Sequence, residues 1–324
     1  MHGERPARSR PRSSVLDWSN PVARWWGLLT LVSLLNIAVW IVLYRNLHEP
    51  QAGSFGGRFG IELMLALCAA YVFGCAFRSL LPRADVQRIC LFDTWLSSVM
   101  VGRTVATIAE VCFAIQWAII LHRLGTMTGA DTTLNAALVI VPLIVIAEGF
   151  SWYAVLTKKY WSNAVENSLW AVAFFVVGLG LFRLLPEFEG VVRAVLIAAI
   201  AGIAGYLAFL ITVDVPMYLK RWRADLASGS APLHPLDGLR DVSRRWVVTH
   251  EHAEWKEEMP WMALYFSAAV WASLALCVFF SLERELPRYR TAPAAEWSAQ
   301  SPVNHDAGMV RGSLKTPAKT GSGG

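Results

Sequence analysis

Acidic side chains stand inside several long apolar stretches of this sequence. Glu110 and Glu148 lie near the middle of two such stretches, and Glu62 lies in a third. A carboxylate at the centre of a bilayer costs on the order of 3 kcal/mol, so it faces the interior of a helix bundle, takes up a proton or finds a partner. Glu110 and Glu148 are therefore the first candidates for binding a proton or a ligand.

A polar stripe accompanies Glu110. Arg103, Thr107 and Glu110 recur at helical spacing, so they share one helix face, which is too polar to face lipid. Glu110 is seven residues beyond Arg103, about 10 Å from the inner end of its stretch, and Glu148 is at about 12 Å. We expect the two carboxyl groups to lie within about 10 Å of each other and to titrate as a coupled pair.

Other polar residues form a layer near the same inner ends. Glu166 and Asn167 open a fifth apolar stretch, and Asp214 closes a sixth. Arg78 and Arg103 lie at this level, where they reach lipid phosphates or pair with an acid such as Asp214 or Glu166. The alternative is that the glutamates only bond across helices and fix the packing. The candidate proton- or ligand-binding residues are Glu110, Glu148, Arg103, Thr107, Glu166, Asn167, Asp214 and Arg78.

Membrane-spanning helices must position these side chains. The chain is 55% hydrophobic and only 16% charged, which excludes an ordinary soluble globule. Apolar runs of about twenty residues, the length that crosses ~30 Å of hydrocarbon, recur along it. The sequence predicts an all-α polytopic bundle of about seven spans: Trp25–Tyr44, Phe59–Leu81, Gly102–Leu121, Thr133–Leu156, Trp161–Phe182, Val191–Leu219 and Met259–Leu282.

The basic residues orient this bundle. When the loops are assigned alternately to the two sides, most Lys and Arg fall on the side of the N-terminus. We therefore expect a cytoplasmic N-terminus, an external C-terminus and a multi-pass protein of a bacterial cytoplasmic membrane, in contact with membrane lipids. The domain organisation is then a basic disordered cytoplasmic tail (1–24), the membrane domain (25–282) and a disordered external tail (283–324).

Two inner segments, 86–100 and 220–258, are amphipathic. In the first, Ile89 and Phe92 share a helix face, which predicts an interfacial helix or a re-entrant turn. In the second, Leu239, Val242 and Trp246 at helical spacing predict a helix along the membrane with these side chains toward lipid. A protein partner could dock on this second segment.

Small residues recur four apart in the sixth span, as in Ala198 with Gly202 and Ala201 with Gly205. Such rows let helix backbones approach closely in lipid. We expect this span to be buried in the bundle.

Several function classes lack the residues that they need. No lysine lies in a span, so no retinal Schiff base is expected, and no histidine lies well inside one, so neither haem nor intramembrane zinc is expected. The net charge of +5 comes from basic residues in loops beside the spans, where they orient the chain in the membrane. This explains the charge better than nucleic-acid binding does. His250 and His252 point to opposite faces of a helix, and the five cysteines show no metal-binding spacing. We expect no cofactor and no metal.

Three functions remain open. The first is a carrier or channel that binds a proton or cationic solute in a cytoplasm-facing cavity built on Glu110 and Glu148. The second is a membrane-embedded enzyme that acts on a lipid or prenyl substrate, with Arg78 and Arg103 on a phosphate. The third is a non-catalytic membrane sensor or assembly partner.

Overall fold

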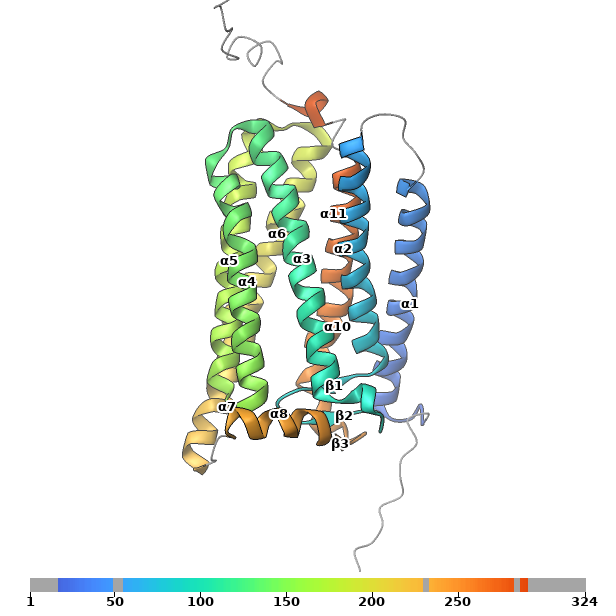
Figure 1. The fold of residues 1–324 in the computed structure, drawn as a ribbon, viewed down its shortest axis with the longest axis vertical. Coiled ribbons are helices and arrows are strands. Elements are labelled where there is room, and N and C mark those ends of the chain that lie inside the picture. Colours follow the sequence, from blue (N-terminus) through green and yellow to red (C-terminus); the bar gives the residue numbers. More distant parts are fainter. Residues whose placement is uncertain (1–16, 49–54, 230–232, 283–285, 291–324) are drawn as a thin grey trace, which may run out of the picture. The chain divides into compact units, whose positions relative to one another are not determined.

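The computed structural model describes residues 17–48, 55–229, 233–282 and 286–290. Within these residues, seven helical segments are long and apolar enough to cross a membrane, so the predicted helical bundle is confirmed. The segments lie side by side along the bundle (Figure 1). Five spans are single helices: α1 (Pro21–His48), α2 (Phe55–Leu80), α3 (Val99–Thr128), α4 (Asp131–Thr157) and α5 (Tyr160–Leu184). The sixth consists of α6 (Gly190–Phe209), η3 (Leu210–Asp214) and α7 (Val215–Ser228), and the seventh of α10 (Glu258–Leu264), η4 (Tyr265–Ala269) and α11 (Val270–Ser281).

A short connection makes α3 and α4 antiparallel neighbours. At the start of α3, the side chain of Ser98 accepts a hydrogen bond from the backbone N–H of Val101. The same helix ends at Gly129, whose φ of 71° lies in the left-handed region that favours glycine. Since α4 already begins at Asp131, α3 and α4 must run in opposite directions side by side.

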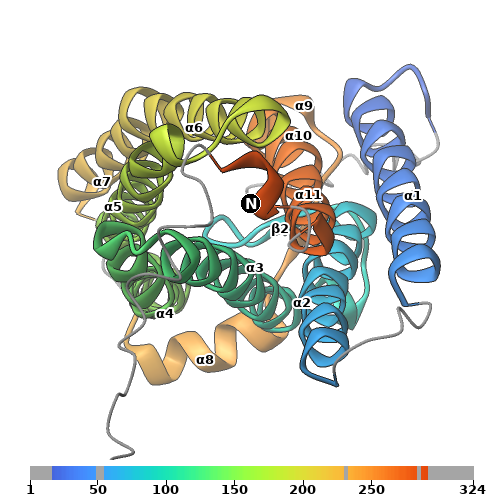
Figure 2. The same ribbon diagram turned by 90° about the horizontal axis from the view of Figure 1, so that it is seen from above.

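The spans pack in chain order from α1 to α6, each against the next. The last span then returns, and α11 packs against α2 and α3, with α1 on its other side (Figure 2). Among the described residues, α6 packs against α5 but makes no comparable contact with α11. The bundle is thus open between its sixth and seventh spans.

A three-stranded sheet and a transverse helix close one end of the bundle, here called the α8 end (Figure 1). The strands are β1 (Arg83–Ala84), β2 (Ile89–Cys90) and β3 (Val247–Val248), and β2 pairs antiparallel with β1 and parallel with β3. The chain enters α1 at this end and leaves α11 at the opposite end. Assignment of the α8 end to the cytoplasm stays a prediction.

Of the two alternatives predicted for 86–100, the interfacial helix is wrong. Arg88 adopts a left-handed φ of 61°, which turns the chain into β2, and the short helix η1 (Trp95–Ser97) follows. The carbonyl of Arg88 accepts a hydrogen bond of 2.7 Å from the backbone N–H of Val247, a residue distant in the sequence. Strand pairing with β3, which periodicity within this segment cannot reveal, replaces the helix.

The segment 220–258 does contain a helix across the end of the bundle, α8 (Pro235–Arg244). Leu239 is 46% exposed on it, but Val242 is completely buried against α3 and α4. Trp246 lies beyond the helix, and its Nε1 donates a hydrogen bond to Asp93. The prediction that all three side chains face lipid is therefore wrong for Val242, because α8 also packs against the spans.

Close contacts hold α8 in this place. A Cβ at Gly238 would lie 2.0 Å from the carbonyl oxygen of Leu156, so only glycine fits there. The guanidinium of Arg88 bonds to Asp241 at 2.8 Å and to the carbonyl of Val155 at 2.6 Å. These bonds join the sheet, α8 and α4.

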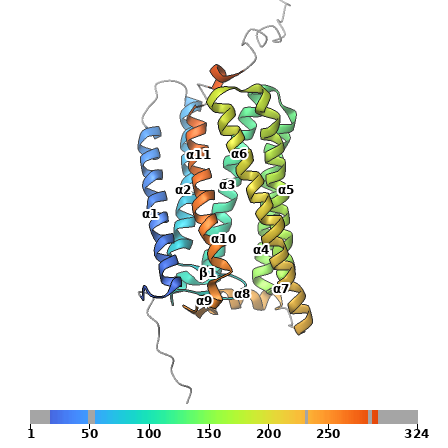
Figure 3. The ribbon, with the colours of Figure 1, turned by 180° about the vertical axis from the view of Figure 1, so that it is seen from behind.

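The helices α6 and α7 of the sixth span follow one another as one long segment (Figure 3). This span is more exposed than the sequence predicted. Ala198, Gly202 and Gly205 are exposed, and a Cβ added at either glycine would meet nothing within 4 Å. The expectation of a span buried by its small residues is therefore wrong. Pro216 lacks the backbone N–H for a regular helical bond, which explains the π-helical segment η3 directly before it.

Most of the two predicted tails lies outside the described residues. Of the N-terminal stretch, residues 21–24 belong to α1. Of the C-terminal stretch, η6 (Leu286–Tyr289) is described, with Leu286 buried, and the carbonyl of Tyr289 accepts a hydrogen bond from the N–H of Glu189.

Candidate functional site

Arg103 and Glu110 are two helical turns apart on α3, so their side chains share a face. Nη2 of Arg103 lies 2.9 Å from Oε2 of Glu110. The same nitrogen lies 2.6 Å from Oε2 of Glu148 on α4. All three side chains are buried, at 6%, 5% and 3% exposure. One guanidinium therefore joins the two glutamates that the sequence places at equal depth.

Neighbouring side chains orient Glu148. The hydroxyl of Thr107 donates a 2.5 Å hydrogen bond to Oε2, and Nε1 of Trp152 donates in turn to that hydroxyl at 3.0 Å. The other carboxylate oxygen, Oε1, has no hydrogen-bond partner among the described residues. The arrangement fixes one oxygen of Glu148 on Arg103 and leaves the other unsatisfied.

Glu166 on α5 completes the cluster. Its Oε1 lies 3.9 Å from Nη1 of Arg103, and its Oε2 accepts a hydrogen bond of 3.1 Å from Asn163. Oxygens of Glu110, Glu148 and Glu166 all lie within 4.8 Å of one another. Three carboxylates against one guanidinium leave an excess of two negative charges if all are ionised, so the cluster must bind protons or a cation.

A metal ion is a poor match for this cluster. Hard cations such as Mg²⁺ and Ca²⁺ take six or more oxygen ligands at short, regular distances. Here Nη2 of Arg103 already bonds to Glu110 and Glu148, in the space between them that an ion would need. The three carboxylates could hold a metal only if Arg103 moved away. A proton or an organic cation suits the geometry better.

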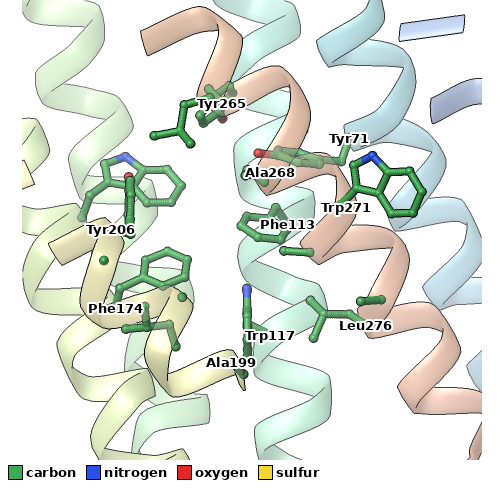
Figure 4. A pocket seen from close by; sticks show the side chains of 18 of the residues that line it. Tyr71, Phe113, Trp117, Phe174, Ala199, Tyr206, Tyr265, Ala268, Trp271 and Leu276 are labelled. Carbon is green, nitrogen blue, oxygen red and sulfur yellow. The ribbon is translucent and has the colours of Figure 1, made fainter. Parts of the chain in front are cut away.

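A cavity of about 720 Å³ extends from the cluster between α3, α5, α6 and the seventh span. Its polar end consists of Arg103, Glu110, Glu166 and Asn167, whereas Glu148 is not among its described lining residues. The rest is largely apolar and rich in aromatic side chains (Figure 4). The aromatic lining residues are Tyr71, Phe113, Trp117, Trp170, Phe174, Tyr206, Phe209, Trp261, Tyr265, Trp271 and Phe279. The lining suits an amphipathic molecule with one polar group.

Sequence reasoning missed this aromatic lining, although a signal for it exists. Phe113 and Trp117 extend the face of Glu110 along α3, and Trp170 and Phe174 extend the face of Glu166 at intervals of four residues. Aromatic stripes at helical spacing are common in cores. These two stripes differ from ordinary core stripes because each shares a helix face with an intramembrane carboxylate.

Several lining residues of the cavity on α6 and on the seventh span are also exposed, which indicates an opening between these two helices, here called the slot. On α6, the slot is lined by Gly202 and Gly205, which are exposed and also line the cavity. On the seventh span, Leu264, Ala268 and Trp271 do the same. Because both helices are membrane spans, the slot opens toward lipid.

Two predicted residues stay outside the cluster. Asp214 is buried in η3, with no hydrogen-bond partner for its Oδ2 among the described residues. Arg78 lies 3.9 Å from Asp85, and its guanidinium stacks over the rings of Trp261 and Phe266. Its ion-pair partner is therefore neither of the two predicted acids, Asp214 and Glu166.

The polar cluster, the aromatic cavity and the slot together form the candidate binding site. The predicted residues Arg103, Thr107, Glu110, Glu148, Glu166 and Asn167 belong to it. The sequence matches no family model, and no curated protein and no solved structure is significantly similar to it.

Proposed function

We propose that this integral membrane protein binds a lipophilic cation, taken up sideways from the bilayer, and carries it in exchange for protons. The observation that supports this most is the meeting of three carboxylates and one arginine at the polar end of a large aromatic cavity. The cation compensates the excess negative charge, and its apolar part fills the cavity.

The direct contacts of the cation are Glu110 and Glu166, since both line the cavity. Aromatic rings beside them add cation–π attraction, worth up to about 2 kcal/mol for a desolvated cation. Tyr71 and Phe113, whose rings stack at 4.6 Å, stand on one side of this end of the cavity. Arg103, held between Glu110 and Glu148, compensates one of the three negative charges, so two remain for the cation and for protons.

Exchange with protons follows from the low dielectric of the site. An empty cluster with two uncompensated charges in the bilayer is costly, so protons take the place of the departing cation. Binding and release of the cation are then coupled to proton uptake and release.

A binding experiment tests whether the protein recognises a lipophilic cation. Hexadecyltrimethylammonium and its neutral analogue, with carbon in place of nitrogen, are titrated against the protein in nanodiscs, with empty nanodiscs as background. Tryptophan fluorescence reports binding because Trp117, Trp170, Trp261 and Trp271 line the cavity. We expect the cation to bind at least tenfold more tightly, a difference of about 1.4 kcal/mol.

Carboxylate variants locate the binding site. Glu110→Gln and Glu166→Gln should remove most of the preference for the cation. Glu62→Gln is the matched control, because Glu62 lies in a span but is not a lining residue of the cavity. Equal affinity for cation and neutral analogue in the unaltered protein would refute the proposal.

Proteoliposomes test the carrier part. An imposed pH gradient should drive accumulation of the cation, and Glu110→Gln should abolish it. Tight binding without pH-driven uptake would leave a binding protein and exclude the carrier.

A further inference from the structure

A second, smaller pocket of about 70 Å³ lies on the α8 side of the cluster. Arg103, Glu166, Asn167 and Trp261 line both this pocket and the large cavity, so the two adjoin. A water needs roughly 10–15 Å³ of such space, so the pocket holds several waters or one small polar group, but no alkyl chain. The other polar lining residues are Arg78, Arg83, Asp85, Gln87, Ser151, Asn163, Tyr218 and Glu258.

Three arginines in this lining have unsatisfied donors. Nη1 of Arg78, Nη2 of Arg83 and Nε of Arg103 are buried and have no hydrogen-bond partner among the described residues. Arg83 is only 1% exposed, and Arg78 and Arg103 are each 6% exposed. Leaving a buried donor unsatisfied destabilises the folded protein, and more so when the group is charged. An acceptor bound in this pocket would lie beside three arginines whose donors the described residues leave without a partner.

The three acids of the pocket already have partners. Glu166 lies 3.9 Å from Nη1 of Arg103 and accepts a hydrogen bond from Asn163. Asp85 accepts a hydrogen bond of 2.8 Å from Nε of Arg83. Glu258 accepts from Gln87 at 2.9 Å and faces Arg221. The unsatisfied groups of this lining are the three guanidinium donors, the hydroxyl of Ser151 and one acceptor, Oδ1 of Asn163. Guanidinium groups in this number match an oxyanion, such as a phosphate, a sulfonate or a carboxylate.

We propose that this pocket binds the oxyanion of the same amphiphile whose cation lies at Glu110 and Glu166. The order of the sites fixes the order of the groups: alkyl chain in the aromatic cavity, cation at the carboxylates, oxyanion at the arginines. The ligand is thus a long-chain zwitterion with its cationic centre between the chain and the oxyanion. This inference rests on the proposed function for the first two sites.

Three probes with the same hexadecyl chain test it in nanodiscs. One carries a trimethylammonium alone, one an ammonium followed by a sulfonate, and one a phosphate followed by a trimethylammonium. We expect the ammonium-then-sulfonate probe to bind at least tenfold more tightly than either of the others. Equal affinity of the two zwitterions would overturn the inference, because the order of charges would not matter.

Variants assign the gain in affinity to the pocket. Arg78→Gln should remove the tenfold gain and leave the affinity for the cation-only probe unchanged. Arg221→Gln is the matched control, since Arg221 also lies near Glu258 but is not a lining residue of the pocket. If Arg78→Gln does not fold, Arg78→Lys keeps the charge and loses the forked donor, and it should lose most of the gain. A gain retained in the folded variants would overturn the inference.

Inorganic phosphate separates a head group from a free ion. At millimolar concentration it should weaken the ammonium-then-sulfonate probe and leave the cation-only probe unaffected. If phosphate instead strengthens cation binding while the sulfonate adds nothing, the pocket takes a free oxyanion, and its link to the amphiphile is refuted. If the cation-only probe did not bind to the unaltered protein, with or without phosphate, the proposed function itself would be refuted.

Discussion

The guanidinium of Arg83 lies directly against Gly102, so that a Cβ at position 102 would lie 1.3 Å from Nη2. Arg83 comes from β1 and enters the bundle under α3, where it pairs with Asp85 and donates to the carbonyl of Ser98 at 3.1 Å. Glycine at 102 is what makes room for it. The sheet and the polar pocket therefore depend on a missing side chain.

Gly102→Ala should destabilise the protein. The new methyl group displaces Arg83 and breaks its bonds to Asp85 and Ser98, and overpacking of this kind costs about 1–3 kcal/mol. Helix propensity alone would favour alanine by up to about 1 kcal/mol. Gly149→Ala is the control, since a Cβ at this helical position meets nothing within 4 Å. Thermal unfolding should give a lower Tm for Gly102→Ala only; a Tm equal to that of the control would contradict the packing described.

Arg103→Gln should be among the most destabilising single changes in the bundle. It leaves three buried carboxylates without their cation, and breaking a buried pair in this way costs about 3–5 kcal/mol. Arg103→Lys keeps the charge but cannot bridge Glu110 and Glu148 with one planar group, so it should be intermediate. Thermal unfolding of the three proteins in one detergent gives the order. Equal stability of Arg103→Gln and the unaltered protein would show that the ion pairs of Arg103 do not hold the cluster together.

Asp85 should contribute to stability at neutral pH. Burial raises the pKa of Asp85, but the Arg83 guanidinium and, behind it, Arg78 more than offset this and leave that pKa below its ordinary value. Its contribution is present above the unfolded pKa of about 3.9 and is lost as the pH falls through the lower folded pKa. Asp85→Asn should therefore unfold at a lower temperature than the unaltered protein at pH 7. The difference should shrink below about pH 4; a constant difference from pH 7 to acid would contradict this account.

Filling the slot should slow access to the cavity. Gly202 faces open space and lines the cavity mouth, so Gly202→Phe places a ring between α6 and the seventh span without a backbone clash. The association rate of hexadecyltrimethylammonium should fall at least tenfold in stopped-flow fluorescence. Gly149→Phe, which is also exposed but lies outside the cavity, should not change it. An unchanged rate in Gly202→Phe would mean that the ligand reaches the cavity by another route.

Apolar runs of about twenty residues predicted the seven spans, because the length and composition of a span are local properties of the sequence. The rise per residue of a helix was enough to predict a similar depth for Glu110 and Glu148. In the structure, carboxylate oxygens of the two residues lie within 4.8 Å of each other. The helical rise could not reveal that Arg103 bridges them, because this depends on which spans are neighbours. The strands were missed for a similar reason: Ile89 pairs with Val247, a partner far away in the chain.

The small residues of the sixth span show the limit of a motif. The spacing of Gly202 and Gly205 suggested that another helix packs closely against them. In the structure both glycines instead line the open slot. Only the position of the neighbouring span distinguishes the two outcomes.

The position of a bound cation tests the central claim most directly. Crystals grown in a lipidic phase with (16-bromohexadecyl)trimethylammonium would locate the tail by the anomalous scattering of bromine and the head by its density. We expect the head between Glu110 and Glu166 and the bromine near Leu124 and Phe279, at the far end of the cavity. An empty cavity, or a ligand bound only on the outer surface of the spans, would contradict the account.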